Sequence, residues 1–487
     1  MIARAVAPTV AAAILITVAR APAAETPLAP APLPAFDETP FGPRYVIEDV
    51  RVAGNRKTER SLIAGELAAL GLAPGRAVDA SDRRVETARY RLLSLGFFLD
   101  VHLSVARGSR RGAVVLIVDV EERGTLVINE IFAATSPATL FWGGTDVAEA
   151  NFLGRGINLG AGFVASTQPL VANAHAGLGL RLHVAVPPLG GPNGVGLSVT
   201  GLYNDGSEFY RASGDDDDSD PGRFVATRVR RIGGVLTAGL LLPANFHASI
   251  SFRQEHDSAQ LPPLAFRTLP DGGKVPIDFM IQQGASRVGS ATGSLQFDNR
   301  SDPVLPRSGA RANLSVEVAS ALLGSSTTFV KGTVEASIYF KMPRGHALGL
   351  HLFGGAISGP APYFDRFFIG DLDLLLPRRA LGINFSTQAP PNFLGTSIER
   401  HRYDDYAGRV LVEYAVPIWR RRGLVYGGDA FVAMGLLGMA SHGDLTGAGS
   451  GAAGLPVDLT GDLGLRLDTY VGVFTISIAN ALSRSSF

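Results

Sequence analysis

Apolar and polar residues alternate with a period of two over most of the chain after about residue 126. Residues 310–318 read ARANLSVEV, so every even-numbered position is apolar and every odd-numbered position is polar or charged. The same alternation runs through residues 174–186, 334–341 and 458–468. This period places successive side chains on opposite faces of an extended strand. We therefore predict a series of strands whose two faces meet different surroundings.

The composition of the two strand faces favours a membrane barrel over a soluble sheet. The polar faces carry Arg, Glu, Lys and Asp in strand after strand, and the apolar faces are mostly Ala, Val, Ile and Leu. Lipid outside and water inside a closed barrel explain this pattern better than a buried core does. After the first residues, no run of about 18 apolar residues occurs, so any membrane span must be β, because only helices and closed barrels satisfy the backbone in hydrocarbon.

Residues 45–123 follow a different pattern, which predicts a small α/β unit. A strand over residues 46–52 precedes the turn signal Gly54-Asn55. Two segments follow in which apolar residues recur at helical spacing, and strands at residues 101–105 and 114–120 close the unit. The predicted order is β-α-α-β-β.

The N-terminus predicts export. Arg4 precedes an apolar run at residues 11–19, and Ala21-Pro22-Ala23 is a small-x-small cleavage pattern, so residues 1–23 are predicted to be a signal peptide. A membrane anchor helix is the alternative, although the run is short for a span. Residues 24–44 form a Pro-rich leader.

Composition and charge exclude several kinds of chemistry. The chain has 46% hydrophobic residues and no cysteine, which rules out disulfides, iron–sulfur clusters and thiolate zinc sites. Its 44 basic and 44 acidic residues balance, so no general attraction to nucleic acid is implied. No nucleophile elbow or metal-ligand spacing is present, and we expect no enzymatic activity, no metal site and no cofactor.

Short motifs in residues 45–123 resemble a POTRA domain, the polypeptide-transport-associated module of the periplasm. They are VAGN, then SLGFF at the end of the second helix, and a closing strand that ends in Glu121-Glu122-Arg123. The residues that carry the resemblance are Gly54, Asn55, Gly96, Phe97 and Phe98.

Residues 124–487 are similar to the barrel of the outer-membrane assembly-factor and two-partner-secretion transporter superfamily, the bacterial surface antigen family. The motifs are NFLGRG at residues 151–156, the D-x-R-x-D-P-x-x-P-x-x-G segment within 297–318, and VEYAVPIW at 412–419. The resemblance implies a transmembrane antiparallel β-barrel of about 16 strands preceded by one POTRA domain. It also implies the outer membrane of a Gram-negative bacterium, with the POTRA domain in the periplasm.

The lid loop of this family is altered here. Family members fold a long outer loop into the barrel, where an Arg of its R-G-F/Y tip meets an Asp in an F-x-D-x-G strand motif. The tip here is LPRRALG, with Arg378 and Arg379, and Ala433 replaces the motif Asp. We predict that Asp429, four residues earlier on the same strand face, or Glu413 takes over as partner. The alternative is that both arginines are solvated loop charges.

The chain stops at SRSSF, about where the family adds one more strand. Either Phe487 is the terminal aromatic of the last strand, or the seam between the first and last strands is incomplete. The pattern gives fifteen or sixteen strands, and the choice stays open.

Three functions fit these predictions: insertion of outer-membrane proteins, a dedicated secretion pore, and a passive porin-like channel. In the first two, the partners are unfolded or extended polypeptides and outer-membrane lipid. The POTRA unit would capture such a client by strand addition at a sheet edge, with residues 46–52 and 114–120 as candidate edge strands.

Overall fold

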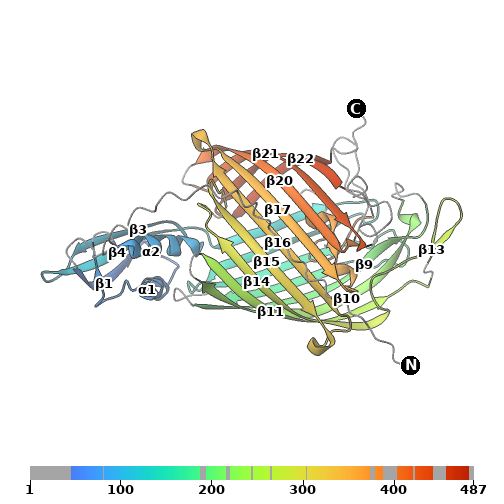
Figure 1. The fold of residues 1–487 in the computed structure, drawn as a ribbon, viewed down its shortest axis with the longest axis horizontal. Coiled ribbons are helices and arrows are strands. Elements are labelled where there is room, and N and C mark those ends of the chain that lie inside the picture. Colours follow the sequence, from blue (N-terminus) through green and yellow to red (C-terminus); the bar gives the residue numbers. More distant parts are fainter. Residues whose placement is uncertain are drawn as a thin grey trace, which may run out of the picture.

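A computed structural model describes residues 45–79, 82–186, 194–214, 220–242, 245–263, 266–302, 304–372, 379–387, 403–420, 423–442 and 457–481. The predicted signal peptide and leader, Arg378 and Phe487 lie outside these residues. A small α/β domain lies at one end of a long barrel (Figure 1). Among the described residues, no helix has the length and apolar character needed to cross a membrane.

The N-terminal domain has two helices against a four-stranded sheet. Its elements are β1 (Tyr45–Ala53), α1 (Arg60–Ala69), β2 (Ala77–Val78), α2 (Arg83–Ser94), β3 (Phe98–Arg107) and β4 (Ala113–Glu122). The strand order is β2-β1-β4-β3, and β1 runs parallel to β4. The short strand β2 is an addition to the predicted order. Of the two predicted edge strands, β4 is wrong, since it lies between β1 and β3. β1 remains largely at the edge, because β2 pairs with it only at Tyr45 and Val46, and β3 forms the opposite edge.

Gly54 shows why the VAGN motif requires glycine. The residue follows β1 with a φ of 82°, and a Cβ there would collide with the carbonyl oxygen of Val120 on β4. Both the left-handed backbone and the close approach exclude other side chains. Gly96, with a φ of 78°, lies just beyond α2 and leads into Phe97 and Phe98, which are buried in the domain core.

Replacing Leu67 by alanine is expected to destabilise the N-terminal domain by about 2–5 kcal/mol, because a buried leucine leaves a cavity. Leu67 lies on α1 with 0% of its surface exposed, in the same core as Ile63 and Leu92. Hydrogen exchange of the full-length protein should show faster exchange within residues 45–122. Tyr90→Ala, at a position 58% exposed, is the control and should leave this exchange unchanged.

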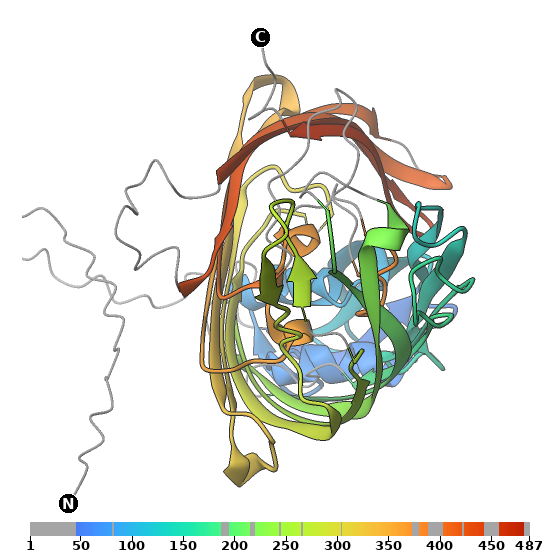
Figure 2. The same cartoon turned by 90° about the vertical axis from the view of Figure 1, so that its right-hand side faces the viewer.

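The rest of the described chain forms one antiparallel sheet of 15 strands that curls into a barrel (Figures 1 and 2). Its strands, in chain order, are β5 (Leu126–Ala134), β6 (Trp142–Phe152), β7 (Ile157–Ser166), β8 (Leu178–Val186), β9 (Val195–Arg211), β10 (Phe224–Leu242), β11 (Phe246–Gln260), β14 (Gly284–Asp298), β15 (Gly309–Ala319), β16 (Phe329–Lys341), β17 (Ala347–Ser358), β20 (Tyr406–Arg420), β21 (Val425–Ala440), β22 (Val457–Thr469) and β23 (Gly472–Ala481). A small hairpin, β12 (Phe266–Thr268) and β13 (Lys274–Pro276), extends the connection between β11 and β14.

The outer face of the barrel is apolar, as the alternation predicted. In β15, Leu314, Val316 and Val318 are 40% to 51% exposed. Large aliphatic side chains on almost every strand share this exposure. Such a continuous apolar surface marks contact with lipid in a strand-built membrane protein.

The two edge strands of the sheet are β5 and β23. Neighbouring strands run in opposite directions, and the number of strands is odd. The first strand and the last strand therefore run in the same direction. They meet near the end of the barrel that carries the N-terminal domain, where the Ile128 backbone N–H donates to the Val471 carbonyl at 2.7 Å. The described residues thus give 15 strands, within the predicted range, and the barrel is nearly closed.

Candidate functional site: the lumen, its lid and the domain junction

The turn between β6 and β7 joins the barrel to the N-terminal domain. Asn151 Nδ2 donates to Thr58 Oγ1 at 2.9 Å, and the Glu59 N–H donates to the Gly154 carbonyl at 2.9 Å. Arg155 also pairs with Glu59 at 2.8 Å. The NFLGRG motif therefore provides the contact surface for this domain.

The loop after Gly54 supports this junction from the domain side. Asn55 Nδ2 donates to the Thr58 carbonyl at 2.9 Å, and the N–H groups of Lys57 and Thr58 donate to the Glu122 carboxylate at 2.9 and 2.7 Å. Burial opposes ionisation of Glu122, but the hydrogen bonds from Thr58 and Lys57 outweigh it and lower its pKa.

The Glu122 contact is expected to make the junction sensitive to acid. A carboxyl whose folded pKa is lowered stabilises the fold above its unfolded pKa, here the ordinary value of 4.5, and that stabilisation is lost as the pH falls through the folded value. The protection factors of the amides in residues 54–59, which correct for the slower intrinsic exchange in acid, should therefore fall below about pH 4.5. In Glu122→Gln this acid-dependent step should disappear. An equal step in both proteins would contradict the assignment.

A lid segment between β17 and β20 lies inside the barrel (Figure 2). Its described parts are residues 359–372, 379–387 and 403–405. The first part contains a 3₁₀ turn (Tyr363–Asp365), β18 (Phe367–Phe368) and α3 (Ile369–Leu372), and β18 pairs with β19 (Tyr403–Asp404). The lid thus has local structure of its own.

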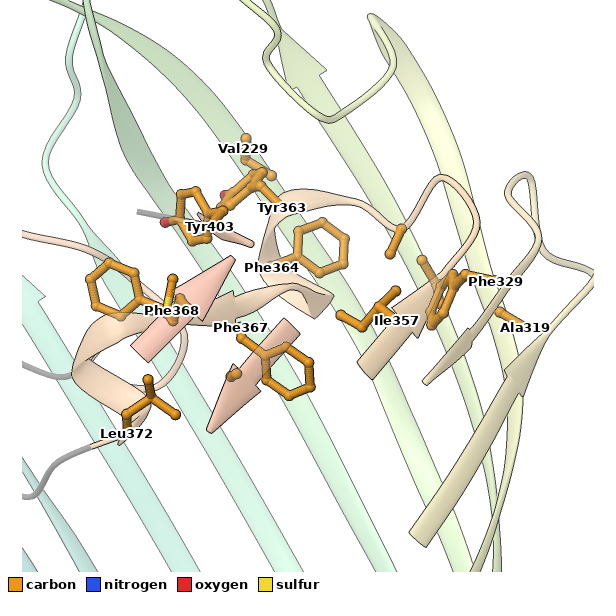
Figure 3. Close-up of a cluster of buried hydrophobic side chains, with 14 of the residues drawn as sticks. Val229, Ala319, Phe329, Ile357, Tyr363, Phe364, Phe367, Phe368, Leu372 and Tyr403 are labelled. Atoms are coloured by element: carbon orange, nitrogen blue, oxygen red, sulfur yellow. The ribbon is translucent and has the colours of Figure 1, made fainter. Parts of the chain in front are cut away.

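Aromatic side chains fix the first part of the lid to the barrel wall (Figure 3). Phe364 and Phe367 belong to a buried cluster that includes Phe329 of β16 and Ile357 of β17. The lid residues of this cluster are Ala361, Tyr363, Phe364, Phe367, Phe368, Leu372 and Tyr403. The barrel therefore has an apolar core on its inside as well as an apolar outer surface, and this core holds the first part of the lid.

Ion pairs add directional contacts to the same half. Asp365 accepts from Arg253 of β11 at 2.7 Å, and Arg253 also pairs with Glu255 at 2.9 Å. Lys331 Nζ of β16 donates to the Asp365 carbonyl at 2.8 Å. The guanidinium of Arg231 lies 3.9 Å from the ring centroid of Phe364. In this contact the lid therefore contributes the acid and the strand the arginine.

The second part of the lid contacts the opposite wall. Phe385 stacks on Trp142 of β6 with ring centroids 4.9 Å apart, and its carbonyl accepts from Ser136 Oγ at 2.8 Å. Asn204 of β9 donates to the Leu381 carbonyl at 2.6 Å. Gly206 makes room for this part, since a Cβ there would lie 2.8 Å from Ile383. The described parts of the lid thus contact the barrel wall at two separate places.

The turn at this second contact is strained. Ala380 and Ile383 exchange two backbone hydrogen bonds of 3.0 Å around Leu381 and Gly382, with φ values of 47° and 82°. A turn with two left-handed residues favours Asn or Gly at both positions, and leucine is unusual there. Contacts of the second lid part with the wall hold Leu381 in this conformation.

The predicted lid partners lie elsewhere. Arg379 donates to the Phe364 carbonyl at 3.3 Å and lies over the ring of Phe368. Asp429 accepts from Arg307 and, at 3.0 Å, from Arg420. Glu413 accepts from Arg466 at 2.8 and 3.0 Å. The prediction that Arg379 pairs with Asp429 or Glu413 is therefore wrong, and Arg378 lies outside the described residues.

Sequence reasoning missed Arg253 and Asp365. The signal was present in SFRQEHD, where Arg253, Glu255 and Asp257 share one strand face, an unusual density of charge. Among the described residues, no group of three or more His, Asp or Glu side chains is arranged to hold a metal ion.

Two cavities lie beneath the lid. One, of about 570 Å³, is lined by inward side chains from β15 to β23, including Arg311, Glu335 and Arg466. The other, of about 500 Å³, lies against β5 to β9 and includes Asp146 and Arg181. Their charged linings agree with the wet interior that the alternation predicted.

A nearly closed antiparallel barrel, a lid folded into its lumen and a small α/β domain at one mouth define the class of outer-membrane transporter barrels. Residues 151–374 match the Omp85 superfamily domain. These residues therefore carry an Omp85 superfamily domain, which confirms the superfamily predicted from the motifs. No curated protein matches the chain.

Solved structures share this fold. BamA from Haemophilus ducreyi lacking POTRA domains 1–3 is 16% identical, with 91% of this chain and 82% of that chain covered and a TM-score of 0.50. CdiB from Acinetobacter baumannii is 12% identical, covering 90% and 70%, with a TM-score of 0.52. CdiB from Escherichia coli is 12% identical, covering 90% and 73%, with a TM-score of 0.56.

Proposed function

We propose that this protein is an outer-membrane polypeptide transporter whose POTRA unit captures extended clients in the periplasm and whose barrel inserts them into the membrane. Dedicated secretion across the membrane is the second candidate, supported by the two lumenal cavities beneath the lid. The similarity to BamA and CdiB supports transport of polypeptides without choosing between these modes. Strand pairing and burial of apolar side chains against lipid drive either step, so catalytic residues and a cofactor are not required.

The weak seam between β5 and β23 is the observation that carries the proposal. β22 and β23 pair over ten residue positions, whereas among the described residues β5 makes one backbone hydrogen bond at the seam, from Ile128 to Val471 in the turn before β23. Parallel strand pairs are also slightly less stable than antiparallel ones. Unpaired edge groups in a membrane are costly, so an incoming strand that pairs with them is stabilised.

The free edge of β3 is the place where the POTRA unit would bind a client. β3 pairs only with β4 in the described sheet, and its outer edge is open to an added strand beyond Val101, whose carbonyl accepts from Arg89. Main-chain hydrogen bonds give affinity without demanding a particular sequence. The part of β1 beyond Val46, which β2 leaves uncovered, remains the second candidate edge.

Photocrosslinking from β3 tests the proposal. A benzoylphenylalanine at Val105, which is 54% exposed on β3, should trap clients in living cells, and the same group at Tyr90 on α2 should not. Many outer-membrane proteins among the products would favour insertion, and one exported protein would favour secretion. A full-length, folded protein that traps no polypeptide from Val105 would contradict transport and favour a passive channel.

A further inference from the structure

A second segment enters the barrel, from the mouth that carries the N-terminal domain. It consists of residues 304–308, between β14 and β15, and we call it the inner segment. Local hydrogen bonds shape it: Ser301 Oγ accepts from the N–H groups of Arg307 and Ser308 at 3.1 and 3.2 Å. Asp302 accepts from the N–H of Leu305 at 3.0 Å. These hydrogen bonds fold the inner segment into an ordered turn.

The inner segment reaches a strand far from its own. Arg307 donates to the Asp429 carboxylate on β21, although β16, β17 and β20 separate β15 from β21 in the sheet. Leu305, only 5% exposed, lies against Gly427 of β21, where a Cβ would be 2.9 Å from its side chain. The segment therefore spans part of the mouth.

Asp429 is the anchor of this contact. The residue is 1% exposed and accepts hydrogen bonds from both Arg307 and Arg420. Charge-assisted hydrogen bonds are strong, and removing one member of a buried pair leaves an uncompensated charge. Without Asp429, the two arginines would face each other as like charges, which would push the inner segment off β21.

The larger lumenal cavity lies behind the inner segment. Val304 and Pro306 of the segment line it, together with inward side chains such as Asn313 of β15 and Glu335 of β16. Moving the inner segment would therefore open this cavity toward the N-terminal domain.

We propose that the inner segment is a gate to the lumenal cavity and that Asp429 is the positioning residue that holds it closed. The inference rests on the proposed transport function and adds its regulation, namely a periplasmic barrier separate from the lid. A client delivered by the POTRA unit meets this gate before it meets the lid.

Cysteine accessibility tests the gate, because the chain has no cysteine of its own. Asn313→Cys places one thiol in the cavity of the purified full-length protein, and a bulky polar maleimide measures its exposure. Labelling should be slow in this background and at least tenfold faster after Asp429→Ala or Arg307→Ala. Asp429→Glu should restore slow labelling, a rescue that loss of packing alone would not give.

Asp205→Ala is the matched control. Asp205 also accepts from two arginines, Arg228 at 2.7 Å and Arg230 at 3.1 Å, but it lies on β9, away from the inner segment. Labelling at Asn313→Cys should stay slow in this variant, and all variants should keep the heat-modifiable gel mobility of a folded barrel. If Asp429→Ala fails to fold, Arg307→Ala decides.

An unchanged labelling rate in folded Asp429→Ala and Arg307→Ala variants would overturn the gate. Equal acceleration by Asp205→Ala would also overturn it, because the barrel would then be loosening as a whole. The labelling assay contains no client, so it tests the gate alone. A failure of the proposed transport function would instead appear in the photocrosslinking experiment.

Discussion

Replacing Arg253 by alanine is expected to increase the frequency of open-channel events in planar bilayers by about tenfold or more. Breaking a buried ion pair costs about 3–5 kcal/mol, and this cost shifts the equilibrium of the lid from the closed state toward open states. Arg253 contacts Asp365 of the lid at 2.7 Å, and it is the strand arginine that binds the lid carboxylate. Its loss leaves that carboxylate with fewer partners in a largely buried position. The measurement is single-channel recording on the purified full-length protein.

Arg228→Ala controls for the loss of an ion-paired arginine in the barrel wall. Arg228 pairs with Asp205 at 2.7 Å, but both lie on the outer face, because their neighbours Val229 and Asn204 face the lid. Asp365→Ala should reproduce the Arg253→Ala phenotype, and the double variant should add little, because both changes remove one interaction. Additive effects, or equal opening by Arg228→Ala, would show that Arg253 does not act through Asp365.

The sequence was sufficient for features that depend on local periodicity. A period of two with charged residues on one face predicts the wet lumen and the lipid face independently of which strands become neighbours. The glycine at residue 54 likewise follows from local backbone geometry, since its φ of 82° admits few other residues.

Features that depend on which residues become neighbours in three dimensions could not be predicted from the sequence. Asp429 does face inward, but its partner Arg307 is 122 positions away along the chain, and no spacing rule links the two. One edge of the N-terminal sheet was assigned wrongly, because strand order depends on which strands the crossover brings together. β4 pairs with β1 on one side and with β3 on the other, which places it in the centre.

A disulfide across the seam is expected to abolish client processing while leaving the barrel folded. The Ile128 N–H donates to the Val471 carbonyl at 2.7 Å, so the two residues are direct neighbours at the seam. Cysteines at both positions would hold the edges of β5 and β23 together, so a client strand could not enter between them. Activity is measured as client insertion or release in cells, with the bridge oxidised or reduced.

The reference pair is Leu463→Cys with Ile478→Cys. These positions face each other within the β22–β23 hairpin, which stays paired in any state of the seam. Oxidation of this pair should leave client processing unchanged, whereas reduction of the seam pair should restore it. Full processing by the oxidised seam variant would exclude lateral passage and leave the lumen, with its lid and inner segment, as the route. In that case the Arg253 and Asp429 variants should change client release, because both barriers would then lie on the path of the client.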